Sequence, residues 1–246
     1  MRVTALLFGL LLAASGAKAG EASVAVAANF TKPIRQLAGQ FEEQTGHRLV
    51  IQIGSTGKIY TQIINGAPFD LFLAADSIRP QRLEREGWTV KGSRYTYAKG
   101  ILVFWMPNVS KCPTARFCFE SNSFASISIV NPKVGSYGYA AKELLEKLGG
   151  LNKYRSRIRQ ANTIAQAYQF VTGKGVEAGL VAMSLIPEKQ RDESNVWVVP
   201  QEFYTPLDQQ VVLLKRAADN QAAKAFLAYL KTPAVRKQIL QFGYNE

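Results

Sequence analysis

The sequence predicts an α/β protein made of two lobes with a ligand cleft between them. Short apolar strands alternate with amphipathic helices in two separate blocks, which is typical of a parallel sheet covered by helices. Two long apolar strands stand far apart in the sequence, and two amphipathic helices end the chain. If the long strands carry the chain between the lobes, the last helices return to the first lobe, and the cleft is the default ligand site.

The first block shows both kinds of periodicity. Leu37, Ala38 and Phe41 have the spacing of one helix face, and Gly46 and Gly66 stand where two helices should end. Uninterrupted apolar runs between them indicate buried strands. The expected elements are a strand over 22–28, a helix over 35–44, a strand over 48–54, a helix over 58–66 and a strand over 69–75.

The second block lies between the two long apolar strands, which cover 100–106 and 208–216. The expected elements there are a strand over 127–131, helices over 139–149 and 164–173, and a strand over 178–183. The pair of terminal helices lies within 220–244. The expected division is therefore a signal peptide over 1–19, a first lobe over 20–100 and 211–246, and a second lobe over 101–210.

The start of the chain predicts export. Arg2 gives a basic beginning, an apolar run covers 3–14, and Ala17 and Ala19 form a small-x-small cleavage signal. The apolar run is shorter than the roughly 20 residues that a membrane helix needs. No cysteine stands near the cut, which argues against a lipid anchor. We expect cleavage near Ala19-Gly20 and an exported, soluble mature protein.

The formal net charge of +12 could mark a nucleic-acid binder, an anion trap or only a solvated surface. The basic residues are scattered along the chain, without a basic arm or a basic-aromatic stripe. This distribution argues against a nucleic-acid partner.

Few residues are suited to catalysis or metal binding. His47 is the only histidine, so a Ser-His-Asp triad has little support, and no nucleophile-elbow motif is present. Cys112 and Cys118 have no second cluster to complete a zinc site, and in an oxidising compartment they predict a small disulfide. Asp70 and Asp76 bracket a strand, where carboxylates usually serve turns and caps. We therefore predict no enzyme, no catalytic residue and no metal site.

The stretch IGSTGKI, residues 53–59, looks suited to hold a phosphate-like anion. It departs from the nucleotide phosphate loop at both ends, because Gln52 replaces the first glycine and Ile59 replaces the hydroxyl residue that binds magnesium. Taken alone, it is best interpreted as a turn between a strand and a helix.

Several stretches resemble a known family in order along nearly the whole mature chain. They are AANF (27–30), GSTGKIYTQIINGAPFDLFLAAD (54–76), NPKVGSYGYAAKELLEKLG (131–149) and AGLVAM (178–183). They look like the periplasmic molybdate-binding proteins of ABC importers, in the branch that carries Asn after the first strand. The resemblance implies the type II periplasmic-binding fold, whose two α/β lobes close on a tetrahedral oxyanion. It also implies a periplasmic monomer without a cofactor that delivers its ligand to a membrane permease.

The resemblance carries ligand-binding roles over to particular positions. Asn29 matches the anion-contacting residue of the first strand-to-helix turn, and Thr56 matches the second hydroxyl of the G-[ST]-[ST]-G turn. Tyr137 and Ile164 match positions in the second lobe that offer backbone N–H groups.

Two positions depart from the pattern of the family. Ala28 replaces a hydroxyl residue found in some members of the Asn branch, and Ala182 stands where other members have a tyrosine hydroxyl. Both departures affect how many hydrogen bonds the ligand receives.

Residue chemistry gives these positions a physical reason. Each falls where a strand or loop enters a helix, and helix starts present unpaired N–H groups and a partial positive charge. Such a site of neutral donors suits fully deprotonated molybdate, and tungstate of nearly the same size. Phosphate keeps a proton, and the loops offer no carboxylate to accept it. The alternatives are a receptor for another anion such as sulfate, or an exported phosphoryl-handling hydrolase.

Overall fold

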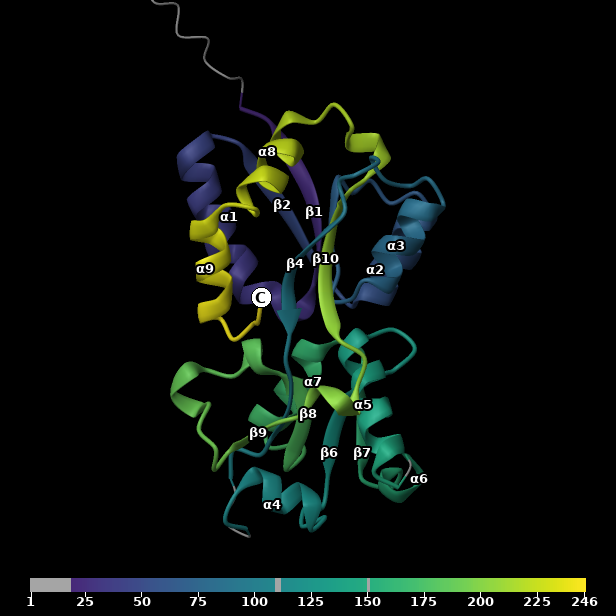
Figure 1. Ribbon diagram of the computed structural model, residues 1–246, viewed down its shortest axis with the longest axis vertical. Helices are drawn as coiled ribbons and strands as arrows, with labels where there is room; N and C mark the ends of the chain where they lie inside the picture. The colour runs from purple at the N-terminus through teal and green to yellow at the C-terminus, as the bar shows by residue number, and fades with distance from the viewer. Residues whose placement is uncertain (1–18, 109–111, 150) are drawn as a thin grey trace, which may run out of the picture.

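The computed structural model describes residues 19–108, 112–149 and 151–246, so residues 1–18 of the predicted signal peptide lie outside it. Figure 1 shows two lobes stacked along the long axis of the molecule, each with helices against a sheet. Each sheet has five strands, so the predicted two-lobe α/β class is confirmed. None of the helices within the described ranges is both long and apolar enough to cross a membrane.

The sheet of the first lobe has the strand order β2-β1-β3-β10-β4. β1 pairs in parallel with β2 and β3, whereas β10 runs antiparallel to both β3 and β4. The parallel sheet expected from the first block is therefore extended by two antiparallel strands. The strands are β1 Glu21–Ala27, β2 Arg48–Gly54, β3 Leu71–Leu73, β4 Tyr95–Gly100 and β10 Leu207–Leu213.

The sheet of the second lobe has the order β7-β6-β8-β5-β9 and repeats the same plan. β6 pairs in parallel with β7 and β8, and β5 runs antiparallel to β8 and β9. The strands are β5 Leu102–Trp105, β6 Ile127–Val130, β7 Ile158–Ala161, β8 Ala178–Ala182 and β9 Val196–Val198.

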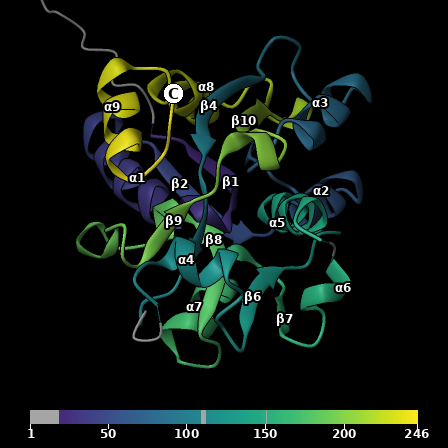
Figure 2. The same cartoon turned by 60° about the horizontal axis from the view of Figure 1, so that its bottom comes forward.

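Helices cover both sheets (Figures 1 and 2). The first lobe carries α1 Thr31–Thr45, α2 Thr56–Ile64, α3 Ile78–Arg85, α8 Gln221–Tyr229 and α9 Pro233–Gln241. The second lobe carries α4 Ala115–Glu120, α5 Ser136–Lys147, α6 Leu151–Tyr154 and α7 Ile164–Thr172. Both views place α2 of the first lobe beside α5 of the second lobe, across the boundary.

The expectation of one continuous strand over 100–106 is wrong. β4 ends at Gly100 in the first sheet and β5 begins at Leu102 in the second, so the chain changes lobes between them. A side chain at Gly100 would overlap the Tyr137 hydroxyl and the Gln209 amide, so only glycine lets the backbone pass this close. The apolar run is continuous because both strands are buried, and periodicity alone does not show the change of sheet.

Helix α1 illustrates how the sequence builds the core. Ile34, Leu37 and Phe41 lie on one face and are fully buried against the first sheet. Gly46 ends the helix in the left-handed conformation, with φ of 72°, and its N–H donates to the Glu42 carbonyl. The C-terminal helix α8 packs on the same core, where the rings of Phe226 and Phe41 meet edge to face at 5.1 Å.

The predicted disulfide is present and joins Cys112 to Cys118. Cys118 belongs to α4, and its side chain is buried in the core of the second lobe. The disulfide thus attaches the segment before α4 to that core, and it lies far from the boundary between the lobes.

Because Phe226 is fully buried, Phe226→Ala should lower the free energy of unfolding by about 3–5 kcal/mol. Urea denaturation followed by circular dichroism measures this change. The same substitution at Phe117, whose side chain is 51% exposed, is the control and should change stability by less than about 0.5 kcal/mol. A loss of stability in Phe226→Ala as small as that in Phe117→Ala would show that α8 is not part of the core.

Candidate functional site

A small hollow at the boundary between the lobes, here called the inner cavity, is lined by buried residues of both lobes. The space open to the centre of a water molecule is about 20 Å³. The first lobe contributes Ala27, Ala28, Asn29, Gly54, Ser55, Thr56 and Ala75, and the second contributes Val130, Gly135, Ser136, Tyr137 and Ile164.

The structure brings all of the predicted ligand-binding residues to this one cavity: Asn29, Thr56, Tyr137 and Ile164. They come from four elements that are separate in the sequence. Their role in binding stays a prediction, because placement alone does not identify a ligand. Of the two departures from the family pattern, Ala28 lines the cavity with them, whereas Ala182 is buried in β8 and is not part of the lining.

The cavity is formed by helix starts. Asn29 lies in the 3-10 turn Ala28–Phe30 that leads into α1, and Thr56, Tyr137 and Ile164 lie in the first turns of α2, α5 and α7. N–H groups of a first turn have no partner inside the helix. These helix starts therefore present N–H groups and a partial positive charge around one space.

Two buried polar atoms of the lining have no hydrogen-bond partner among the described residues. They are the Ser55 hydroxyl and Oδ1 of Asn29. Ser55 is the N-cap of α2, but its side chain makes no capping bond there. By contrast Thr163, the N-cap of α7, accepts from the Gln166 N–H at 3.1 Å. A buried hydroxyl without a partner is costly, so this hydroxyl is available to a ligand or a water molecule in the cavity.

Ser55 is a residue that the sequence reasoning missed. The resemblance pointed to the second hydroxyl of the turn, Thr56, whose Oγ1 accepts from the Ala75 N–H at 3.1 Å and keeps its own proton to donate. The signal was present in the sequence, because Ser in front of an apolar helix is a typical N-cap. Only the structure shows that its hydroxyl is not used for capping.

The cavity holds no charged side chain among its lining residues. Lys58, which follows the Gly-rich turn, is exposed on α2. Neutral N–H and O–H donors therefore dominate the site. Within the described part of the chain, no group of three or more His, Cys, Asp or Glu side chains could hold a metal ion.

Hydrogen bonds between the lobes close the cavity on one side. The Gly57 N–H donates to the Val134 carbonyl at 2.9 Å, and the Ser136 hydroxyl donates to Asp76 at 2.5 Å. A Cβ at position 57 would lie 2.8 Å from that carbonyl oxygen, so glycine permits the contact.

Both aspartates that bracket β3 have structural partners. Asp76 accepts from the Arg79 backbone N–H at 3.1 Å and also pairs with the Arg79 guanidinium. Asp70 accepts from the Ser23 N–H at 2.8 Å and pairs with Arg216 at 2.6 Å. These contacts agree with the predicted structural roles.

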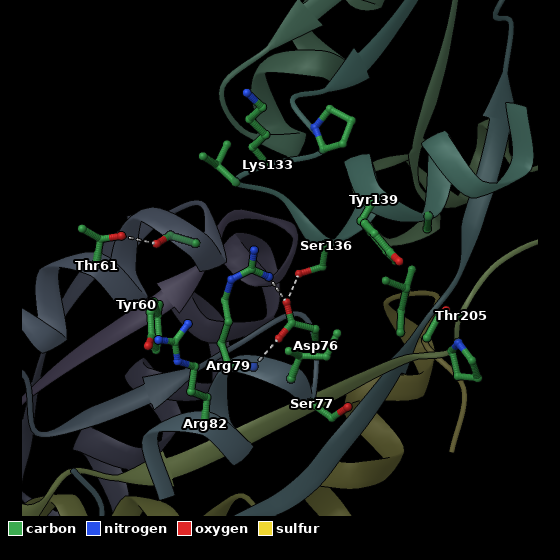
Figure 3. Close-up of a pocket in the computed structure, with 17 residues that line it drawn as sticks. Tyr60, Thr61, Asp76, Ser77, Arg79, Arg82, Lys133, Ser136, Tyr139 and Thr205 are labelled. Carbon is green, nitrogen blue, oxygen red and sulfur yellow. Dashed lines mark hydrogen bonds and ion pairs between the residues drawn. The ribbon is translucent and has the colours of Figure 1, made fainter. Parts of the chain in front are cut away.

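A larger hollow of about 480 Å³, here called the outer groove, lies beyond the contact between Ser136 and Asp76 (Figure 3). Its charged residues are Asp76, Arg79, Arg82 and Lys133. Arg79 pairs with Asp76, and Arg82 pairs with Glu86 at 2.7 Å. Because its polar groups are exposed or already paired, the outer groove fits a small ligand less well than the inner cavity does.

A buried polar network lies behind the cavity. Gln209 on β10 accepts from Asn29 and from the Tyr97 hydroxyl, and it donates to the Tyr137 hydroxyl. Asn29 also donates to the Tyr244 hydroxyl at 2.9 Å. Burial raises the pKa of Tyr97, Tyr137 and Tyr244 well above the ordinary value, so all three phenols stay neutral.

Comparison with known proteins agrees with this geometry. The family described as bacterial extracellular solute-binding protein matches residues 22–245. The molybdate-binding protein ModA of Azotobacter vinelandii is 44% identical over 244 residues, which is 99% of this chain and 96% of that protein. ModA of Rhodobacter capsulatus is 40% identical over 240 residues, 98% of this chain and 93% of that protein.

A solved structure is also similar to this chain over nearly its whole length. The periplasmic molybdate-binding protein of Azotobacter vinelandii superposes with a TM-score of 0.86 and 36% identity, over 92% of this chain and 99% of that chain. The likeness therefore extends over both lobes and the boundary between them.

The buried phenols predict a dependence of stability on alkaline pH. Their folded pKa is raised above the unfolded value of about 10, so the folded state keeps protons that the unfolded chain loses. Their contribution to stability is complete below about pH 10 and falls as the pH rises further, by about 1.4 kcal/mol per pH unit for each phenol. Denaturant unfolding at a series of pH values measures it.

Ultraviolet titration of the native protein is the direct check on these phenols. Tyr97, Tyr137 and Tyr244 should give no tyrosinate signal until the protein unfolds. Full tyrosinate absorbance in the folded state would contradict the burial of this network.

Proposed function

The chain belongs to the family of bacterial extracellular solute-binding proteins, and on that premise we propose that it captures molybdate in the periplasm for a membrane ABC importer. The observation that carries the proposal is the inner cavity, where helix starts of both lobes and an unpartnered hydroxyl surround a small space without charged side chains. The named relatives are binding proteins, which supports transport rather than catalysis.

We assign the donors from their places in the lining. The Ser55 and Thr56 hydroxyls donate from the start of α2, and the backbone N–H groups of Asn29, Tyr137 and Ile164 donate from the other helix starts. Hydrogen bonds to a charged group contribute about 1.5–3 kcal/mol each. Several such bonds from both lobes offset the dehydration of a dianion and hold the lobes together.

The donor chemistry also orders the candidate ligands. A fully deprotonated tetrahedral dianion takes a hydrogen bond at each oxygen, which fits molybdate and, at nearly the same size, tungstate. Sulfate has the same charge and is the second candidate ligand. Only the size of the cavity distinguishes sulfate from molybdate. Monohydrogen phosphate brings a proton, and no carboxylate lines the cavity to accept it.

The remaining parts of the proposal follow from the sequence and the family. The protein is exported by a signal peptide cut near Ala19-Gly20 and works as a monomer without a cofactor. The expected lobes are residues 20–100 and 211–246 against 101–210, with β10, Leu207–Leu213, bringing residues 207–210 into the sheet of the first lobe. Binding closes the lobes on the ligand. The lobes then present the anion to the membrane permease.

Thermal unfolding tests the ligand. Molybdate at about 100 times its dissociation constant adds about 2.7 kcal/mol to the stability of the folded state, which raises the melting temperature by about 5–10 °C for a chain of this size. Tungstate should act similarly and phosphate at the same concentration much less. Equal shifts from phosphate and molybdate would rule out the proposed ligand class.

Substitution of Ser55 tests the site. Ser55→Ala removes the unpartnered hydroxyl and should weaken molybdate binding roughly 10- to 150-fold, the value of one charge-assisted hydrogen bond. Calorimetric titration measures the change. The matched control is Ser77→Ala, because Ser77 lines only the outer groove. Lys58→Ala should have a small effect that fades with salt. A larger loss for Lys58→Ala than for Ser55→Ala would contradict a site of neutral donors.

A further inference from the structure

Gln209 connects the two sides of the inner cavity without lining it. The side chain is fully buried on β10. Its Oε1 accepts from Asn29 Nδ2 at 2.9 Å, and its Nε2 donates to the Tyr137 hydroxyl at 3.2 Å. Asn29 belongs to the first lobe and Tyr137 to the second, and both line the cavity. One amide therefore joins the two sides of the site.

The present orientation of these amides leaves two polar groups unmatched. Oδ1 of Asn29 is buried without a donor among the described residues. The Tyr137 hydroxyl accepts from Gln209, and no acceptor for its own proton is present within the described ranges. A buried acceptor and a buried donor thus lie at the two ends of the same short chain of hydrogen bonds, and each costs stability.

Turning both amides by 180° satisfies both groups. Gln209 Oε1 then accepts from Tyr137, and Gln209 Nε2 donates to Asn29 Oδ1. The Tyr97 hydroxyl, 3.0 Å from Gln209, can accept from that amide because it also has the Ala74 carbonyl, at 3.2 Å, as acceptor.

The remaining members of the network also allow the turn. The Tyr244 hydroxyl, 2.9 Å from the Asn29 amide, can donate to Oδ1 instead of the Asn29 carbonyl. That carbonyl keeps the Ser184 hydroxyl as a donor, at 3.1 Å. Only Asn29 Nδ2 gives up its protein partners, Gln209 and Tyr244, and it is thereby released to donate to a ligand.

We propose that Gln209 is a positioning residue that sets which end of the Asn29 amide faces the ligand, and so selects between deprotonated and protonated oxyanions. With the amides turned, Nδ2 of Asn29 donates to a fully deprotonated anion such as molybdate. In the opposite orientation Oδ1 accepts, which suits an anion that carries a proton, such as monohydrogen phosphate. This inference rests on the proposed function, because it assigns the selectivity of the same site.

The two orientations differ in what they require of residue 209. The orientation that serves molybdate needs a donor at position 209 facing Asn29, and the Gln209 amide donates to Asn29 while accepting from Tyr137, which an ionised carboxylate cannot do. A carboxylate at this position only accepts. Gln209→Glu therefore holds Asn29 Nδ2 toward residue 209 and leaves Oδ1 for the ligand, at the same side-chain size.

The experiment compares molybdate with inorganic phosphate by calorimetric titration at about pH 8, where phosphate is mainly the monohydrogen dianion. Both ligands then carry the same charge, so repulsion from a new carboxylate cancels in the ratio of their dissociation constants. In Gln209→Glu the preference for molybdate over phosphate should fall at least about tenfold, the value of one charge-assisted hydrogen bond.

The matched control is Gln210→Glu, the same substitution at the next residue of β10. The Gln210 amide bonds to Arg94 and Thr96 and does not reach the network. The preference of the Gln210→Glu variant for molybdate over phosphate should equal that of the unmodified protein. A preference that is unchanged in Gln209→Glu, with molybdate still bound by the unmodified protein, overturns the inference alone. If the unmodified protein binds no molybdate, the proposed function itself fails.

A measurement on the unmodified protein covers the case in which Gln209→Glu does not fold. Side-chain NH₂ signals of ¹⁵N-labelled protein are recorded before and after molybdate is added, with Asn29→Ala and Gln209→Met used for assignment. The Asn29 and Gln209 signals should both shift, although Gln209 does not line the cavity, and the Gln210 signal should not. An unchanged Gln209 signal overturns the inference.

Discussion

The structure depends on one constraint: polar groups that are buried at the boundary between the lobes must find partners. Several helix starts line the inner cavity, and the Ser55 hydroxyl is buried there without a partner among the described residues. Unsatisfied buried groups of this kind cost about 1–3 kcal/mol each. A tetrahedral oxyanion matches them with acceptors in several directions at once. In the proposed function, the contact between the lobes and the binding of an anion therefore depend on the same groups.

The same constraint explains why a basic protein has a neutral binding site. The formal net charge of +12 attracts anions from a distance, but that attraction is screened within about a Debye length and does not distinguish one dianion from another. Selectivity requires donors at fixed positions, and helix starts provide them without flexible side chains. The charged side chains at the boundary, such as Arg79 and Arg82, line the outer groove and are paired.

Sequence reasoning was most successful where the signal is local. The resemblance to the family pointed to Asn29, Thr56, Tyr137 and Ile164, and local helix-start signals gave these positions a physical reason. Their meeting at one cavity became visible only in the structure. Gln209 could not be identified in this way, because its partner Asn29 is 180 residues away in the sequence. The strand over 100–106 was misjudged because burial hides the point at which the chain passes from one sheet to the other.

The proposed closing of the lobes on an anion can be weighed from the sizes of these terms. The Gly57–Val134 and Ser136–Asp76 hydrogen bonds join the lobes and involve protein groups alone. An ordinary hydrogen bond contributes about 0.5–1.5 kcal/mol net, or up to about 3 with a charged acceptor. The buried Ser55 hydroxyl, without a partner among the described residues, opposes this contact by about 1–3 kcal/mol. The ligand is then the deciding term, because it turns that opposition into several charge-assisted bonds. A receptor that must release its ligand needs this near balance, since lobes held shut by their own contacts would retain the anion.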